Sequence, residues 1–149
     1  DENRAEFEAS GFRLVSKLID GTFPDYGRVI PRDNDKRVRV DPEAMLAAVD
    51  RVSTVSSERG QAVKLRLAND ALTFSVNSPD SGTATDEMSI EMPQPFEIEI
   101  GFNAAYLSKM LATFDTDAVE IAFNEPGSPT LFTNPNDEHR LVVLMPMRV

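Results

Sequence analysis

The stretch Val38-Arg39-Val40-Asp41-Pro42-Glu43-Ala44-Met45 decides the fold, because its pattern returns as Ile100-Gly101-Phe102-Asn103-Ala104-Ala105-Tyr106-Leu107. In each copy an alternating strand pattern runs into a polar residue suited to cap a helix, Asp41 or Asn103. The apolar residue before each cap and the one four positions after it are spaced to form a hydrophobic staple. The apolar stripes of the two predicted helices are Met45, Val49 and Val52, and Leu107, Met110, Leu111 and Phe114.

The two copies superpose at one constant offset. We therefore predict an internal duplication of a β-α-β-β-β unit, with a period of about 60 residues, and an α+β fold class. Chance similarity of two amphipathic helices is the weaker explanation, because cap, staple and stripe recur together. Asn69-Asp70 predicts a tight turn between two strands. The apolar residues of the predicted strands are Val63, Leu65, Leu67, Leu72, Phe74, Val76, Met88, Ile90, Met92, Ile98, Ile100, Val119, Ile121 and Phe123, with a last strand from about Arg140 to Leu144.

Residues 1–22 stand outside the duplication. Alternating apolar residues around Ser10-Gly11 predict a hairpin there, and a lone hairpin is marginal in water. We therefore expect this segment to be the end of a preceding domain, and the chain to be part of a longer protein. Since the polar segment 31–36 suits an interdomain linker, we predict that residues 1–31 end the preceding domain and that 32–149 form the duplicated one.

Composition excludes several classes of protein. The chain has 149 residues, of which 41% are hydrophobic and 27% charged, which is typical of a soluble globular domain. It has no cysteine, hence no disulfide framework, and no membrane-span pattern or secretory signal, so we expect a cytoplasmic protein. The net charge of −10 argues against tight nucleic-acid binding through dense basic side chains.

No constellation of residues predicts catalysis. The only histidine, His139, lies in a polar stretch that predicts a surface turn, without an identifiable partner for a catalytic base. There is no phosphate-binding glycine loop or nucleophile elbow. Asp33 and Asp35 could hold a divalent ion loosely, but solvation of a linker is the simpler reading. Glu97 and Glu99 have the spacing of ordinary exposed strand residues. We expect a protein that is not an enzyme and uses no cofactor and no metal.

Two stretches carry a family resemblance. The segment from Ser16 to Tyr26, followed by Arg28-Val29-Ile30-Pro31, is similar to the connector between the middle and last domains of bacterial DNA sliding clamps, the beta subunits of DNA polymerase III. The segment Val143–Val149 closely resembles the end of those proteins, and Ile100-Gly101-Phe102-Asn103 also matches. With the duplicated architecture between these stretches, the resemblance spans essentially the whole chain.

The resemblance implies a DNA-clamp fold, with two helices on one side of antiparallel sheets. It also implies a ring-forming processivity factor, closed head-to-tail as a homodimer around duplex DNA, which tethers the polymerase and is not itself an enzyme. Its partners would be DNA polymerase subunits and the clamp loader, through short peptides bound in a hydrophobic groove. By resemblance, the groove residues are Pro24, Arg28, Val29, Val143, Leu144, Met145, Pro146 and Met147.

The sequence also supports a groove independently of the resemblance. Because Leu141–Met145 is apolar at every position, both faces of that strand need cover, and one face can enter the core. The adjacent methionines are adaptable enough for varied peptides. The alternative is an interior strand with a tail folded against it, which is the usual role of an apolar run.

Two further surfaces follow from the resemblance. Arg51, Arg59 and Lys109 would face the DNA, although they also suit solvated helix faces. Encirclement needs only weak phosphate contacts, so the acidic net charge is no obstacle. The protomer interface would use Thr54 and Val55 at the end of the first helix, with the acidic edge strand that carries Asp86 and Glu87. Such acids either prevent aggregation or pair with a basic partner.

Two other functions stay open at this stage: an acidic protein-interaction module without a DNA role, and an enzyme of unknown chemistry. In isolation we expect the chain to be monomeric, because the domain that completes the ring contact is absent.

Overall fold

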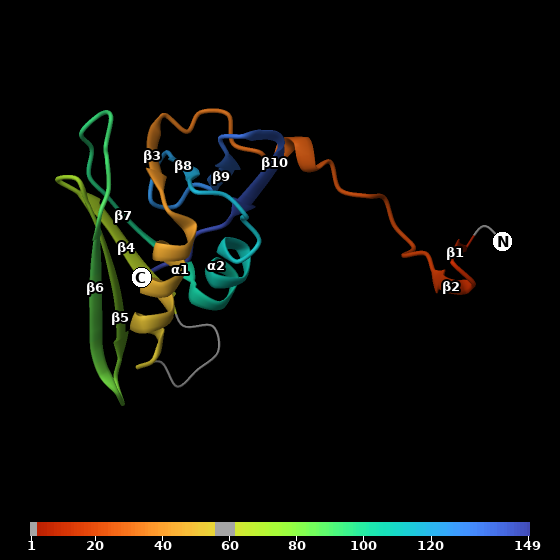
Figure 1. Cartoon of the computed structure of the whole chain (residues 1–149), viewed down its shortest axis with the longest axis horizontal. Coiled ribbons are helices and arrows are strands. Elements are labelled where there is room, and N and C mark those ends of the chain that lie inside the picture. The colour runs from red at the N-terminus through yellow and green to blue at the C-terminus, as the bar shows by residue number, and fades with distance from the viewer. Residues whose placement is uncertain (1–2, 56–61) are drawn as a thin grey trace.

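The computed structural model describes residues 3–55 and 62–149 (Figure 1). Two four-stranded antiparallel sheets, a pair of helices and a separate hairpin make up the fold. The elements are β1 (Arg4–Ala9), β2 (Phe12–Lys17), η1 (Tyr26–Arg28), β3 (Lys36–Val40), α1 (Pro42–Ser53), β4 (Ala62–Ala68), β5 (Ala71–Ser78), β6 (Gly82–Ser89), β7 (Ile98–Asn103), α2 (Ala104–Leu111), β8 (Val119–Phe123), β9 (Thr130–Asn134) and β10 (Asp137–Leu144).

The predicted duplication is confirmed, because β3-α1-β4-β5-β6 and β7-α2-β8-β9-β10 repeat one order of elements. Each unit lends its first strand to the other. One sheet has the order β10-β9-β8-β3 and the other β6-β5-β4-β7. Strand exchange makes neither unit complete alone, so the two copies form one domain with a pseudo-twofold arrangement.

Both helices begin as predicted. The Asp41 carboxylate accepts hydrogen bonds from the backbone N–H groups of Glu43 and Ala44, at 2.8 and 3.2 Å. The Asn103 side chain accepts one from the N–H of Tyr106 at 3.0 Å. These bonds satisfy N–H groups that a helix start leaves unpaired. The helices also touch each other, since the Ser108 hydroxyl donates to the Asp50 carboxylate at 3.1 Å.

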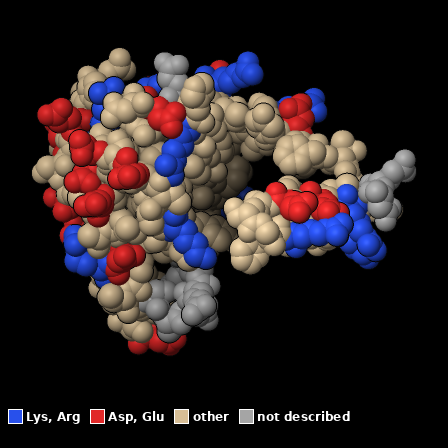
Figure 2. All heavy atoms as spheres, turned by 45° about the vertical axis from the view of Figure 1, so that its right-hand side comes forward, with Lys and Arg blue, Asp and Glu red and all other residues tan. Residues whose placement is uncertain are grey.

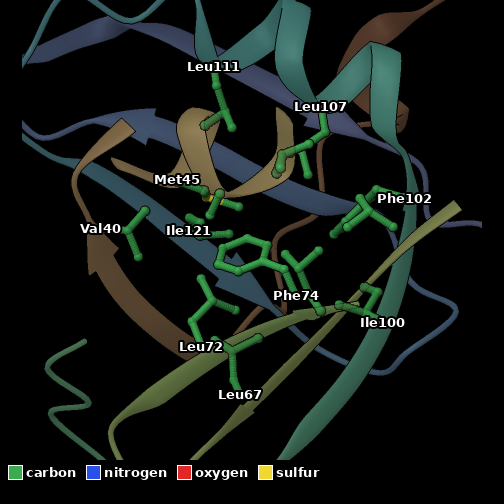
Figure 3. Packing of buried hydrophobic residues seen from close by; sticks show 14 of the residues in the cluster. Val40, Met45, Leu67, Leu72, Phe74, Ile100, Phe102, Leu107, Leu111 and Ile121 are labelled. Atoms are coloured by element: carbon green, nitrogen blue, oxygen red, sulfur yellow. The ribbon is translucent and has the colours of Figure 1, made fainter. Parts of the chain in front are cut away.

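The core lies between the helix pair and the sheets (Figure 3). Both staples are buried: Val40 with Met45 on α1, and Phe102 with Leu107 on α2. Phe102 of β7 also meets Phe132 of β9 edge to face, with ring centroids 6.2 Å apart, an arrangement that aromatic pairs favour. Because β7 and β9 belong to different sheets, this contact holds the two sheets together.

β3 and β7 are edge strands, and each forms one bridge to the segment that follows the outermost strand of the other sheet. Arg39 on β3 forms an isolated antiparallel bridge with Glu91, just after β6. Gly101 on β7 forms the corresponding bridge with Met147, just after β10. Since unpaired edges invite pairing with other chains, these two bridges shield positions that the strand order leaves open.

Several details differ from the sequence prediction. α2 ends at Leu111, so Phe114 is buried from the turn that follows the helix. β6 ends at Ser89, before Ile90 and Met92, and Ile90 donates its N–H to the carbonyl of Asp70 at 2.9 Å. β10 begins at Asp137, which places His139 on a strand and not in a turn. The strand pattern did not reveal β9.

The segment before the duplicated domain contains the predicted hairpin. Ser10 and Gly11 have φ values of 50° and 82°, the left-handed geometry of a two-residue turn. The hairpin stands away from the two sheets (Figure 1). It exposes large apolar side chains, among them Phe12 at 81%. Within the described residues, no helix combines the length and apolarity needed to cross a membrane.

Candidate functional site

The outermost strand β10 has one face on the core and one face open. It pairs with β9 alone, so it is a sheet edge and not the interior strand of the alternative interpretation. Val142 and Leu144 pack against the core, whereas Leu141 is 41% exposed and Met145 57%. Because side chains alternate along a strand, Val143 shares the open face with them. The result is an apolar strip that keeps part of its surface exposed.

Beyond β10 the chain continues along the other sheet. The Met147 N–H donates to the Gly101 carbonyl at 2.7 Å, which places residues 145–149 across the edge of β7. The side chains of Met147 and Val149 keep 39% and 59% of their surface exposed. An open cavity of about 530 Å³ lies beside this segment. Its wall combines Glu99–Gly101, Pro126, Gly127 and Pro146–Val149.

The other predicted groove residues lie on the connector. Pro24 precedes η1, Arg28 ends it and Val29 follows it, and all three are exposed. Val29 exposes 51% of its surface. In Figure 1, η1 is drawn toward the side of the domain where β10 runs. The cavity beside Met147 is not lined by Pro24, Arg28 or Val29, so that cavity does not unite the two predicted halves of the groove.

The predicted DNA-facing and interface residues are linked by an ion pair. The Arg51 guanidinium on α1 contacts the Asp86 carboxylate on β6 at 2.6 Å. Hydrogen bonding to Arg51, with a smaller contribution from the backbone N–H of Glu87, holds the pKa of Asp86 below its ordinary value. Lys109 is exposed on α2. Arg59 lies outside the described residues.

The rest of the predicted interface lies around the same edge. β6 is the outer strand of its sheet. The Thr54 hydroxyl donates to the Arg51 carbonyl at 2.8 Å, and Val55 is partly buried against the core. Glu87 accepts a hydrogen bond from the Thr73 hydroxyl at 3.2 Å. Asp86 is partly buried and paired with Arg51, whereas Glu87 is exposed, so Glu87 is the more available acid of this edge.

Charge is unevenly distributed over the surface. Figure 2 shows acidic side chains gathered over one part of the domain and basic side chains in a separate strip. A hollow separates this body from the hairpin in the same view. Within residues 3–55 and 62–149, no group of three or more acidic or histidine side chains is placed to hold a metal ion.

Sequence reasoning missed one residue of this region, Gly101. The sequence patterns assign Gly101 no role in a site, yet it lies directly beneath Met147 and Val149. A glycine inside a strand pattern signals a close backbone approach, and that signal was present in Ile100-Gly101-Phe102.

Comparison with known proteins gives a consistent result. The family model for the DNA polymerase III beta subunit, C-terminal domain, matches residues 27–148. The beta sliding clamp of Caulobacter vibrioides is 42% identical over 147 residues, which cover 98% of this chain and 39% of that protein. The Pseudomonas aeruginosa beta sliding clamp is 35% identical and is covered over 37% of its length. The chain thus spans about two fifths of the relatives it matches.

Solved structures agree with the sequence comparison. The DnaN sliding clamp of Bartonella birtlesii bound to griselimycin superposes with a TM-score of 0.93 at 40% identity, over all of this chain and 40% of that one. A DNA polymerase sliding clamp from Caulobacter crescentus gives 0.90 at 41% identity, again over all of this chain and 40% of that one. The α+β architecture described above is therefore that of the sliding clamps.

Proposed function

Since the chain belongs to the family of the DNA polymerase III beta subunit, C-terminal domain, we propose that it is the last domain of a ring-shaped processivity factor of DNA replication. The ring encircles duplex DNA and is a homodimer in the full-length protein. It works in the cytoplasm as a non-catalytic accessory subunit, holding the polymerase at the template. The domain contributes the binding surface for short peptides of DNA polymerase subunits and of the clamp loader.

One observation supports the peptide site above the others. β10 is an edge strand whose outward face is apolar from Leu141 onward and partly exposed, with Met145 57% exposed directly after it. Apolar side chains left open beside a sheet edge suit a short extended guest, which gains affinity from burial and specificity from side-chain pockets. The likeness to a clamp whose structure holds griselimycin agrees with a ligand-binding role for proteins of this fold.

The connector completes the site in this proposal. Pro24, Arg28 and Val29 form the second wall, facing Val143–Met147. Residues 1–31 then belong to the preceding domain and its connector, and 32–149 to the last domain. The exposed apolar side chains of β1 and β2, such as Phe7 and Phe12, would be covered by the remainder of the preceding domain. That domain would also fix η1 relative to β10.

The remaining surfaces serve the ring. Lys109 and Arg59 offer weak phosphate contacts, joined by Arg51 when its pairing with Asp86 loosens. Topological encirclement requires no dense basic patch, which suits a net charge of −10. The edge strand β6, with Thr54 and Val55 beside it, meets the partner protomer, and Glu87 supplies charge complementary to a basic partner surface.

A peptide titration tests the proposal. The 149-residue chain is titrated into a fluorescein-labelled peptide that carries a glutamine followed by leucine and phenylalanine, and anisotropy is recorded. We expect saturable binding with a micromolar dissociation constant, because a short peptide buries a small interface. The control peptide has alanine in place of those three residues. Equal anisotropy curves for the two peptides would mean that the surface does not recognise this class of ligand.

The same titration separates the alternative function. An acidic interaction module without a DNA role has no reason to prefer the glutamine-leucine-phenylalanine peptide over its alanine control.

A further inference from the structure

Gly101 has no room for a side chain. A Cβ atom built on it would lie 2.2 Å from Cγ1 of Val149 and 2.8 Å from the carbonyl oxygen of Met147. Both separations are far below van der Waals contact. The second atom belongs to the backbone, so a change of side-chain rotamer alone cannot relieve it. The 145–149 segment can therefore occupy its observed position only against a residue without a side chain.

Backbone conformation does not explain this glycine. Within residues 3–55 and 62–149, the glycines with positive φ are Gly11, Gly21 and Gly82, and Gly101 is not among them. It continues β7 between the buried residues Ile100 and Phe102. The local geometry accepts any residue, and only the segment above requires glycine.

The duplication provides an internal comparison. Arg39 on β3 occupies the position that corresponds to Gly101 on β7, and it forms the corresponding bridge, with Glu91. The arginine side chain is accommodated there. The shared fold, including its bridge, therefore tolerates a long side chain at this position, and the need for glycine is specific to the unit that carries residues 145–149.

We propose that Gly101 is a positioning residue of the peptide site: by carrying no side chain, it lets the 145–149 segment lie directly on β7 and fixes Met147 at the wall of the site. This inference rests on the proposed function. The Met147 N–H donates a hydrogen bond to the Gly101 carbonyl at 2.7 Å, and this bond sets the distance between the 145–149 segment and β7. The Val149 side chain, lying over the glycine, holds the segment from its far side.

A preformed wall explains why this close approach would matter for binding. Met145 and Met147 flank Pro146, and Met147 is the residue that is anchored to β7. If the segment were free, a guest peptide would have to order it on binding and lose affinity accordingly. Anchoring it on β7 removes that cost while leaving the methionine side chains adaptable.

The test uses single substitutions in the 149-residue chain and the same labelled peptide. Gly101→Ala is expected to weaken binding about tenfold or more, because the segment must lift from β7. The matched control is Gly127→Ala. Gly127 lines the same cavity, but a Cβ there meets nothing within 4 Å, so we expect affinity within about twofold of the unsubstituted chain.

A second substitution distinguishes positioning from general damage. Val149→Ala alone should weaken binding about two- to threefold, because the segment loses its contact over Gly101. In the Gly101→Ala background the same change should instead restore part of the affinity, since it removes the 2.2 Å clash. A reversal of sign of this kind is the signature of two directly coupled residues, and a loss of fold would not produce it.

The outcomes are distinct. No binding by the unsubstituted chain refutes the proposed function itself. Binding by the unsubstituted chain with equal affinity for Gly101→Ala refutes only the positioning role, as does a failure of Val149→Ala to recover any affinity in that background. If Gly101→Ala does not fold, Val149→Ala alone decides, because Val149 is 59% exposed: weaker binding supports the role and unchanged binding overturns it.

Discussion

Replacing both Met145 and Met147 with alanine is expected to weaken peptide binding about 30-fold, equivalent to about 2 kcal/mol. Both side chains are substantially exposed in the free chain, at 57% and 39%, so a guest peptide gains from covering them. The two long, adaptable side chains would form much of the apolar wall. The measurement is the dissociation constant of the labelled glutamine-leucine-phenylalanine peptide for the 149-residue chain.

The controls separate binding from folding. Since neither methionine belongs to the buried core, the free energy of unfolding should change by less than about 0.5 kcal/mol. Phe12→Ala serves as the surface variant, because Phe12 is 81% exposed on the hairpin that stands away from the two sheets (Figure 1). A double methionine variant that binds as tightly as Phe12→Ala would remove both methionines from the site.

The largest effect on stability is expected from Phe102→Ala, at about 3–5 kcal/mol. Phe102 is fully buried, it precedes the cap of α2, and its ring meets Phe132 of the other sheet at 6.2 Å. The substitution thus opens a cavity, loses the aromatic pair and removes the staple in one step. The loss in the free energy of unfolding is measured by urea denaturation of the 149-residue chain, followed by the circular dichroism of the helices and sheets.

Two variants frame this prediction. Phe12→Ala removes the same side chain from a site that is 81% exposed, and it should cost less than about 0.5 kcal/mol in the free energy of unfolding. Phe102→Leu keeps much of the volume and should fall between the two. If Phe102→Ala cost no more than Phe12→Ala, the contact between the sheets would not carry the stability assigned to it.

Much of the fold follows from local rules that act within a few residues. A cap, a staple and an apolar stripe occur together at Asp41 and again at Asn103, and both helices begin where these signals lie. The turn at Asn69-Asp70 was predictable for the same reason, since both residues adopt positive φ, at 54° and 59°. The repeated pattern also predicts topology, because corresponding strands of two copies of one unit are expected to occupy corresponding positions in the sheets.

Long-range contacts lay beyond such rules. Asn34 belongs to the predicted linker, yet it is 6% exposed and donates hydrogen bonds to the carbonyls of Ala122 and Pro129, at 2.8 and 3.0 Å. No local pattern announces partners that lie so far along the chain. The same holds for the Arg51–Asp86 pair and for the place of Gly101 under Val149. Each depends on which strands become neighbours.

The candidate site also has one part that local sequence patterns predict and one part that they do not. Because Leu141–Met145 is apolar at every position, the sequence predicts that one face of this strand enters the core and that the other needs separate cover, and the exposed fractions of Leu141 and Met145 agree. The union of that face with Pro24, Arg28 and Val29 came from resemblance and stays a proposal. Connector residues have no periodic pattern that ties them to a sheet edge, so their position depends on the domain that precedes them.

The most direct test of the peptide site is methyl NMR of the 149-residue chain labelled with ¹³C at the methionine methyl groups. On addition of the glutamine-leucine-phenylalanine peptide, we expect the resonances of Met145 and Met147 to shift in a saturable way. The resonances of Met45 and Met110, which are 0% and 7% exposed, should stay in place as internal controls. Saturable binding of the peptide without any shift at Met145 and Met147 would contradict the account, because the guest would then occupy another surface.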